Sequence, residues 1–124
     1  MSEGEEMIRV LVVDDNVSFR GALVSLLEGQ PDIEVVGTAG SLSEARTMLK
    51  GVDVALLDRG LPDGDGLELV GELRSVNPKA RVFVISSTAE VIHPTDAMEA
   101  GADGVIDKFD TPEQVFAAIR EHGA

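Results

Sequence analysis

The chain has 124 residues, 44% of them hydrophobic, which is enough for one domain of ordinary size and leaves no room for a second. Its 23 acidic and 10 basic residues give a net charge of −13, which disfavours direct binding to nucleic acid or to anionic membranes. The absence of cysteine excludes disulfides, thiolate zinc sites and cysteine nucleophiles.

The N-terminal segment, residues 1–6, is acidic and has neither the basic start nor the apolar stretch of a signal peptide. We expect it to be a flexible tail in front of a single domain over residues 7–124. No apolar run approaches the ~20 residues that a membrane span needs. A cytoplasmic domain is therefore expected.

Five short apolar runs predict five β-strands. Several of these runs are apolar on both faces, which suits a parallel sheet covered by helices on each side. The predicted strands are, in chain order, residues 8–13, 33–36, 52–57, 81–85 and 104–106.

Amphipathic stretches between the strands predict helices. The first has an apolar stripe and ends near Gly29 and Pro31. Its stripe comprises Phe19, Leu23, Leu26 and Leu27. The second starts with a capping box, in which the Ser41 hydroxyl and the Glu44 carboxylate can satisfy each other's free amides. Its expected core residues are Leu42, Ala45, Met48 and Leu49.

Three further helices complete the alternation. The third is expected over residues 65–76. Pro94 cannot lie inside a helix without the loss of a hydrogen bond, so the fourth helix is expected to be short, over residues 94–100. A capping box at Thr111, with Pro112 at the first helical position, starts the last helix. The whole pattern predicts an α/β fold of five βα units with right-handed crossovers.

Chemically capable side chains follow four of the five predicted strands. Asp14 and Asp15 follow the first strand, Asp58 the third, Ser86 the fourth and Lys108 the fifth. Each alone is an ordinary residue, since acidic residues often form turns or caps and most lysines are solvated. The carboxyl ends of parallel strands meet at one edge of a sheet, which is where ligands bind in such folds. Their joint placement therefore indicates a site.

The charges of this group suggest its chemistry. Three carboxylates in one pocket repel one another unless a cation enters. Oxygen ligands without nitrogen or sulfur suit Mg²⁺, which often bridges to phosphate. Mg²⁺ and Lys108 together would balance the three carboxylates. Such a site can accept phosphoryl oxygens while one carboxylate acts as the nucleophile.

Four motifs carry a resemblance to a known family: VVDDN at 12–16, LLDRGLPDGDGLELV at 56–70, VISS at 84–87 and GADGVIDK at 101–108. On these motifs the chain resembles the receiver domain of two-component response regulators, over about Met7 to Glu121. The stretch from Phe19 through PDIEVVGTAGSLSEA is most similar to the subfamily that often carries a helix-turn-helix output domain. The resemblance implies a flavodoxin-like, doubly wound (βα)5 fold, with a five-stranded parallel sheet in the order 2-1-3-4-5.

The resemblance also implies a role for each site residue. Asp58 would be the phosphoacceptor, Ser86 would hydrogen-bond the phosphoryl group, and Lys108 would pair with it. The implied ligands of Mg²⁺ are Asp14, Asp15, Asp58 and the main-chain carbonyl of Gly60, with Asp15 the more direct of the first two. Gly66 matches the family's turn after the acceptor strand, and it can equally serve backbone geometry alone.

The partners that the resemblance implies follow from these roles. A sensor histidine kinase or a phosphotransfer protein would donate the phosphoryl group. An output domain or a separate effector would receive the signal, and a homodimer is a further possible arrangement. The domain would hydrolyse its own acyl phosphate without being an enzyme that turns over a separate substrate.

Three residues depart from the family pattern. Val105 stands where the family usually has a switching aromatic ring, and Phe109 follows Lys108 where a proline is frequent. Without a proline, the bond before Phe109 is expected to be trans, because a cis bond there would cost about 3 kcal/mol. Pro94 shortens the fourth helix. We therefore expect the response to phosphorylation to be small around Val105 and larger in the loop over residues 87–93.

Two other functions stay open. A degenerate receiver would only bind partners and would ignore phosphorylation. A Mg²⁺-dependent aspartyl phosphohydrolase of the haloacid-dehalogenase type would have an acid two residues after the nucleophile, but Gly60 stands there. A dinucleotide-binding site is not expected, because no glycine-rich motif follows the first predicted strand. An EF-hand starting at Asp63 would have Arg74 at its twelfth position instead of glutamate.

Overall fold

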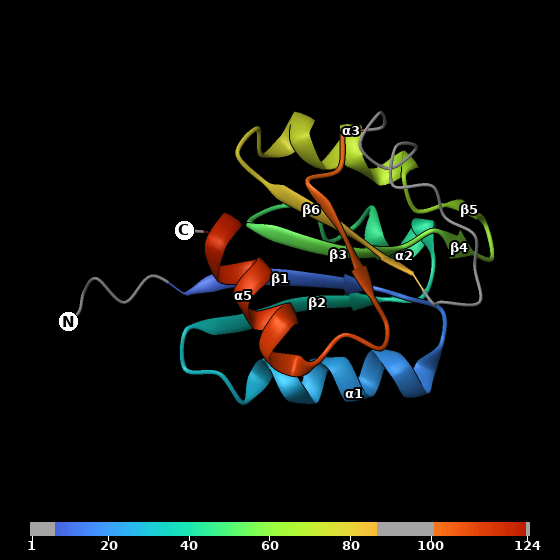
Figure 1. Ribbon diagram of the computed structural model, residues 1–124. Helices are drawn as coiled ribbons and strands as arrows, with labels where there is room; N and C mark the ends of the chain where they lie inside the picture. Colours follow the sequence, from blue (N-terminus) through green and yellow to red (C-terminus); the bar gives the residue numbers. More distant parts are fainter. Residues whose placement is uncertain (1–6, 87–100, 124) are drawn as a thin grey trace.

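The computed structural model describes residues 7–86 and 101–123 of the chain. A five-stranded parallel sheet forms its centre, in the order β2-β1-β3-β6-β7 (Figure 1). Its strands are β1 (Ile8–Val13), β2 (Ile33–Ala39), β3 (Val54–Asp58), β6 (Arg81–Ser86) and β7 (Gly104–Asp107). Since β6 and β7 are the fourth and fifth strands of this sheet, the expected order 2-1-3-4-5 is confirmed. The expectations for residues 1–6, 87–93 and 94–100 lie outside the described residues.

Two pairs of helices cover the sheet. Figure 1 shows α1 and α5 together on one face and α2 and α3 on the other. The bounds are α1 (Val17–Glu28), α2 (Leu42–Ala45), α3 (Glu68–Val76) and α5 (Pro112–Gly123). Leu11 and Val13 pack into the core under α2 and α3, whereas Val10 and Val12 pack into the core under α1 and α5. This burial of β1 on both faces explains why its sequence is continuously apolar.

The first helix begins and packs largely as its sequence predicts. Asn16 caps it, since its side-chain oxygen accepts the Phe19 N–H at 2.9 Å. Leu23 and Leu27 of the predicted stripe are buried, and Phe19 is partly buried. Leu26 is 44% exposed, so its assignment to the core stripe was wrong. It lies at the rim of a cavity between α1 and α5, which leaves one side of it open to solvent.

The second helix is shorter than its apolar pattern suggested, with only four residues. Ser41 accepts the Glu44 N–H at 3.1 Å, as a capping box requires, but the Glu44 carboxylate accepts the N–H of Gly40 instead of Ser41. The Thr47 hydroxyl donates to the Glu44 carbonyl at 2.7 Å, and such local bonds compete with helix continuation. The helical turn therefore ends early, although the following Leu49 is buried as expected.

The third helix starts at Glu68, three residues later than residue 65, where the pattern placed it. The chain between β3 and this helix forms a small antiparallel hairpin of β4 (Gly60–Leu61) and β5 (Gly64–Asp65), so residue 65 belongs to a strand. One carboxylate oxygen of Asp65 accepts the Leu67 N–H at 2.9 Å. That bond draws Asp65 into the turn ahead of the helix, which is why the helical period begins only afterwards.

β2 also extends beyond its predicted end, through Gly37 to Ala39. A side chain at position 37 would crowd the Met48 sulfur at 3.0 Å and the Leu11 side chain at 3.1 Å. Glycine therefore lets the strand continue under these side chains, and it marks close packing here instead of a strand end.

The last helix has the predicted start. The Thr111 N–H donates to the Gln114 side-chain oxygen at 2.8 Å, and the Gln114 N–H donates to the Thr111 hydroxyl at 3.2 Å. This is a complete capping box. None of the helices in the described part of the chain has the length and apolar character that a membrane crossing needs.

Arginine–carboxylate ion pairs connect several of these elements. Arg120 of α5 pairs with Asp32 just before β2 at 2.7 Å, and Arg74 of α3 pairs with Asp103 just before β7 at 2.6 Å. Two further pairs join Arg46 to Glu72 and Arg59 to Asp65, each at 2.9 Å. Exposed pairs of this kind contribute little stability, but these four engage most of the described arginines internally.

Asp63 ties the β4–β5 hairpin to α2. Its two carboxylate oxygens accept the Leu42 N–H at 2.8 Å and the Ser43 N–H at 3.0 Å. These main-chain donors stabilise the ionised carboxylate and hold the pKa of Asp63 below its usual range. A carboxylate thus supplies the anionic cap that the start of a helix favours.

We expect the Asp63→Asn variant to lose less stability than the wild type when the pH falls from about 5 to about 3. A carboxyl group whose pKa is lower in the folded state stabilises the fold above its unfolded pKa of about 3.9. That stabilisation disappears as the pH falls through the folded pKa, and asparagine has none to lose. Urea unfolding at a series of pH values measures the difference. An equal or steeper decline in the variant would contradict the assignment.

Candidate functional site

Asp14 lies at the carboxyl end of β1 and is completely buried. Its main chain is held on both sides, because its N–H donates to the Ala39 carbonyl at 2.9 Å and its carbonyl accepts from the Arg20 guanidinium at 2.7 Å. One carboxylate oxygen, Oδ1, accepts the Asn16 N–H at 2.8 Å. The neighbouring Asp15 is exposed. The pair therefore combines one fixed, buried carboxylate with one that solvent reaches.

Asp58 ends β3 and is 5% exposed. Its Oδ1 accepts the Gly60 N–H at 3.1 Å, which orients the carboxylate over the start of the following hairpin. Carboxylate oxygens of Asp14, Asp15 and Asp58 lie within 4.8 Å of one another. Two adjacent strands thus bring three acidic groups to one point, as the sequence predicts.

Lys108 supplies a cation to the same point from the chain just after β7. Its Nζ lies 3.2 Å from Asp14 Oδ2 and 3.9 Å from Asp58 Oδ2, and its side chain is 17% exposed. Its main-chain N–H donates to the Ser86 carbonyl at 2.6 Å, so the ends of β6 and β7 are joined there. Ser86 is buried and follows Ile85, which pairs with Asp58 across the sheet. The side chains of Asp14, Asp15, Asp58 and Lys108 therefore meet at one edge of the sheet, and Ser86 ends the neighbouring strand at the same edge.

The donor set fits a hard divalent cation. Asp14 Oδ2 is buried and has no hydrogen-bond partner within the described residues, although the Lys108 ammonium lies close to it. A buried carboxylate oxygen left in this way favours the approach of a further cation. The three carboxylates are the ligand type that Mg²⁺ prefers.

An ion pair within the loop after Asp58 holds this loop in place. Arg59 pairs with Asp65 at 2.9 Å across the β4–β5 hairpin. Burial raises the pKa of Asp65, but the hydrogen bonds from Arg59 and from the Leu67 N–H outweigh this effect and hold the pKa below its usual range. A fixed negative charge on Asp65 thus keeps Arg59 turned across the hairpin.

Gly66 is required by the close approach of two backbone segments. A Cβ atom at this position would lie 2.1 Å from the main-chain oxygen of Asp58. The Gly66 N–H also donates to the Arg59 carbonyl at 3.0 Å. The absence of a side chain therefore allows the loop to pack directly against the residue that carries the central carboxylate.

Two of the residues that depart from the family pattern, Val105 and Phe109, lie within the described part of the chain. Val105 is half-buried and packs near Val84 and Ala102. Phe109 is 75% exposed. Every described peptide bond is trans, so the expected trans bond before Phe109 is confirmed.

Two residues at the site were missed in the sequence. Phe19 was assigned only to a core stripe, yet its ring centroid lies 4.7 Å from the Lys108 ammonium. Arg20 was not singled out, although it holds the main chain of Asp14. Their positions one turn into the helix that follows Asp14 and Asp15 were the available signal, because that turn faces the same edge of the sheet.

The comparison with known proteins agrees with this geometry. Residues 10–120 match the model of the response regulator receiver domain family. The chain is 38% identical over 120 residues to the DNA-binding transcriptional activator DevR/DosR of Mycobacterium tuberculosis, covering 95% of this chain and 55% of that protein. It is 40% identical over 111 residues to a protein-glutamate methylesterase/protein-glutamine glutaminase of Halalkalibacterium halodurans, covering 87% of this chain and 32% of that protein.

A solved structure shows the same fold. The CheY-like response regulator receiver domain protein from Methanospirillum hungatei is 26% identical and superposes with a TM-score of 0.82, covering 95% of this chain and 94% of that one. The two curated relatives are about twice and three times as long as the match, and they carry different activities. What they share with this chain is therefore the receiver part alone. The match to the family model, together with the order of the sheet, shows that the chain belongs to the response regulator receiver domain family.

Proposed function

We propose that this domain, over residues 7–124 behind a short N-terminal tail, is a phosphorylation-dependent switch in which Asp58 accepts the phosphoryl group. The observation that carries the proposal is the buried Asp58 carboxylate with the Lys108 ammonium 3.9 Å away and two further carboxylates beside it. A carboxylate in such a place can attack phosphorus while nearby cations accept the charge of the phosphoryl oxygens.

The phosphoryl donor that fits is a phosphohistidine on a sensor histidine kinase or a phosphotransfer protein in the cytoplasm. An oxygen of Asp58 forms a bond to phosphorus, the phosphorus–nitrogen bond of the donor breaks, and the imidazole leaves. The Ser86 hydroxyl donates a hydrogen bond to the transferred group, and Lys108 pairs with it. This transfer needs positioning and charge stabilisation more than covalent chemistry from the protein.

We propose Mg²⁺ as the cofactor, held by Asp14, Asp15, Asp58 and the main-chain carbonyl of Gly60. The support is the set of carboxylate oxygens within 4.8 Å of one another and the buried Asp14 oxygen, which has no hydrogen bond from the part of the chain that the structure describes. When bound, the ion neutralises charge on the phosphoryl oxygens. The protein orients its carboxylates for this through the Asn16 and Gly60 N–H groups.

The signal would pass to an output domain or a separate effector. We propose that the domain does not act as an enzyme on a separate substrate. DevR/DosR, one of the relatives, is a DNA-binding activator, which supports an output of this kind. The degenerate receiver and the phosphohydrolase remain the alternatives, and homodimer formation remains a prediction.

Mass spectrometry after treatment with acetyl phosphate and Mg²⁺ tests the proposal. We expect one adduct of about 80 Da on the wild type and none on Asp58→Asn. Asp63→Asn is the matched control, since it removes one carboxylate outside the pocket and should be labelled normally. Undiminished labelling of Asp58→Asn would disprove the assignment, and no labelling of the wild type would favour a degenerate receiver. Continuous release of phosphate from an added phosphomonoester would favour the phosphohydrolase.

A further inference from the structure

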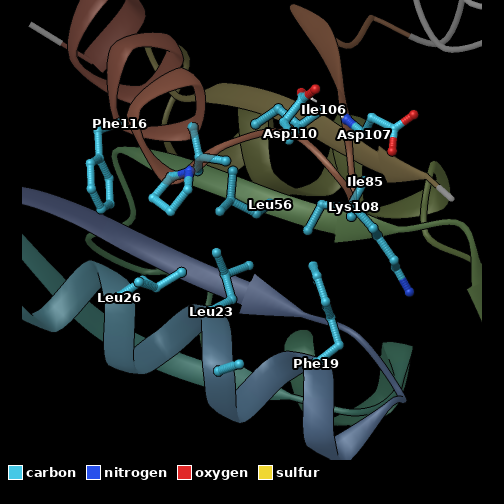
Figure 2. A pocket seen from close by; sticks show the side chains of 13 residues that line it. Phe19, Leu23, Leu26, Leu56, Ile85, Ile106, Asp107, Lys108, Asp110 and Phe116 are labelled. Atoms are coloured by element: carbon cyan, nitrogen blue, oxygen red, sulfur yellow. Dashed lines mark hydrogen bonds between the residues drawn. The ribbon is translucent and has the colours of Figure 1, made fainter.

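Phe19 presents its ring to the cation of the site. The Lys108 Nζ lies 4.7 Å from the ring centroid, within the range of about 6 Å over which a cation is attracted to an aromatic face. Figure 2 shows Phe19 rising from α1 beside Lys108, whose nitrogen lies at the edge of the group of side chains. The chain has no tyrosine or tryptophan, so only phenylalanine can supply such a face.

The other contacts of the Lys108 ammonium are two ion pairs of unequal length. It lies 3.2 Å from Asp14 Oδ2, an oxygen that makes no hydrogen bond with any described residue, and 3.9 Å from Asp58 Oδ2. Charge attraction without a directional bond does not fix the position of an ammonium group. The ring of Phe19 is a third contact of this ammonium, from the side of α1.

A cavity adjoins the same ring. It has a volume of about 310 Å³, lies between α1 and α5, and is lined mainly by apolar side chains. Figure 2 shows Leu23, Leu26 and Leu56 around it, with Phe19 between them and the Lys108 nitrogen. An apolar cavity of about 150 Å³ is enough to hold benzene, so a phenylalanine ring has room to move here.

We propose that Phe19 is a positioning residue for Lys108, and that its ring shifts toward the α1–α5 cavity when a phosphoryl group on Asp58 draws the ammonium away. This inference rests on the proposed function. A phosphoryl group carries more negative charge than the carboxylate it modifies, so Lys108 moves toward it and loosens its contact with the ring. The aliphatic Val105 cannot report the state of the site by swinging a ring, whereas Phe19 can.

The first part of the test uses NMR on the metal-free protein, where phosphorylation plays no part. An aromatic face shifts the resonances of the Lys108 ε-methylene protons, and we expect Phe19→Leu to abolish that shift and Phe19→Tyr to retain it. Leu26→Ala is the matched control, because Leu26 lines the same cavity at the end away from the Lys108 nitrogen (Figure 2). The proposal is overturned if Phe19→Leu leaves the Lys108 resonances unchanged, or if Leu26→Ala alters them equally.

The second part uses beryllofluoride with Mg²⁺ as a stable substitute for the phosphoryl group. We expect the ring resonances of Phe19 and the methyl resonances of Leu23 and Ile106 to change. With acetyl phosphate, Phe19→Leu should slow labelling of Asp58 by about two- to fivefold, and Phe19→Tyr should restore the rate. A wild type that is labelled but shows a silent Phe19 refutes this inference alone. A wild type that is not labelled refutes the proposed function, while the metal-free spectra still decide the positioning role.

Discussion

Replacing Gly66 by alanine is expected to lower the free energy of unfolding by about 3 kcal/mol, the upper end of the usual cost of forcing atoms into a packed site. The new Cβ would lie 2.1 Å from the Asp58 main-chain oxygen and 3.5 Å from the Arg59 Cα. Both neighbours are backbone atoms, so neither can turn aside as a flexible side chain would. The end of β3 must move, and we expect the melting temperature to fall by about 10 °C.

Gly71→Ala provides the matched control in the same region. Gly71 lies within α3, and apart from the adjoining backbone of that helix no atom of the described residues lies within 4 Å of the position that its Cβ would occupy. Alanine there should raise stability by about 0.5–1 kcal/mol, because glycine is a poor helix former. Thermal unfolding of both variants measures the contrast. Equal effects of the two substitutions would show that the close approach at Gly66 does not constrain the loop.

Magnesium should stabilise the fold more than any surface substitution would. At a concentration ten times its dissociation constant, a ligand that binds only the folded state adds about 1.4 kcal/mol. For a domain of this size that corresponds to a rise of about 5 °C in melting temperature. The physical reason is the crowding of Asp14, Asp15 and Asp58, whose mutual repulsion the ion would relieve.

The control separates site binding from general screening of an acidic protein. Asp15→Ala should lose most of the magnesium-dependent rise, whereas Asp63→Asn should keep it. Sodium chloride at matched ionic strength should reproduce little of the rise, because screening acts on the whole surface. If calorimetry finds no binding and the melting temperature does not move, the metal site is excluded.

The central sheet could be predicted because a strand that is buried on both faces has a continuously apolar sequence. The run from Ile8 to Val13 forms β1 with the predicted bounds, since every residue near its end faces a core. The ends of the helices depend on local hydrogen bonds, which are harder to predict from the sequence. The early end of α2 depends on the Thr47 hydroxyl, and the late start of α3 depends on Asp65 bonding to Leu67. These choices between competing short bonds are decided by neighbours that the apolar pattern does not contain.

The grouping of the site residues followed from topology alone, because parallel strands that end in polar residues must present them at one edge. The contacts between elements did not follow. Asp63 caps α2 across a separation of about twenty residues, and Phe19 meets Lys108 from a different helix. Both pairs depend on how the elements pack together, and neither residue type is unusual at its own position.

The internal pairing of the arginines has a consequence for the speed of encounter with a donor. Arg46, Arg59, Arg74 and Arg120 hold carboxylates of this same chain, and Lys108 lies within the pocket. The net charge of −13 makes the field outside the molecule negative, and cations paired in this way do little to offset it locally, so an anionic phosphoryl donor approaches against it. Collisions with a small anionic donor become more frequent as ionic strength rises, and a protein donor gains most if its docking face is basic.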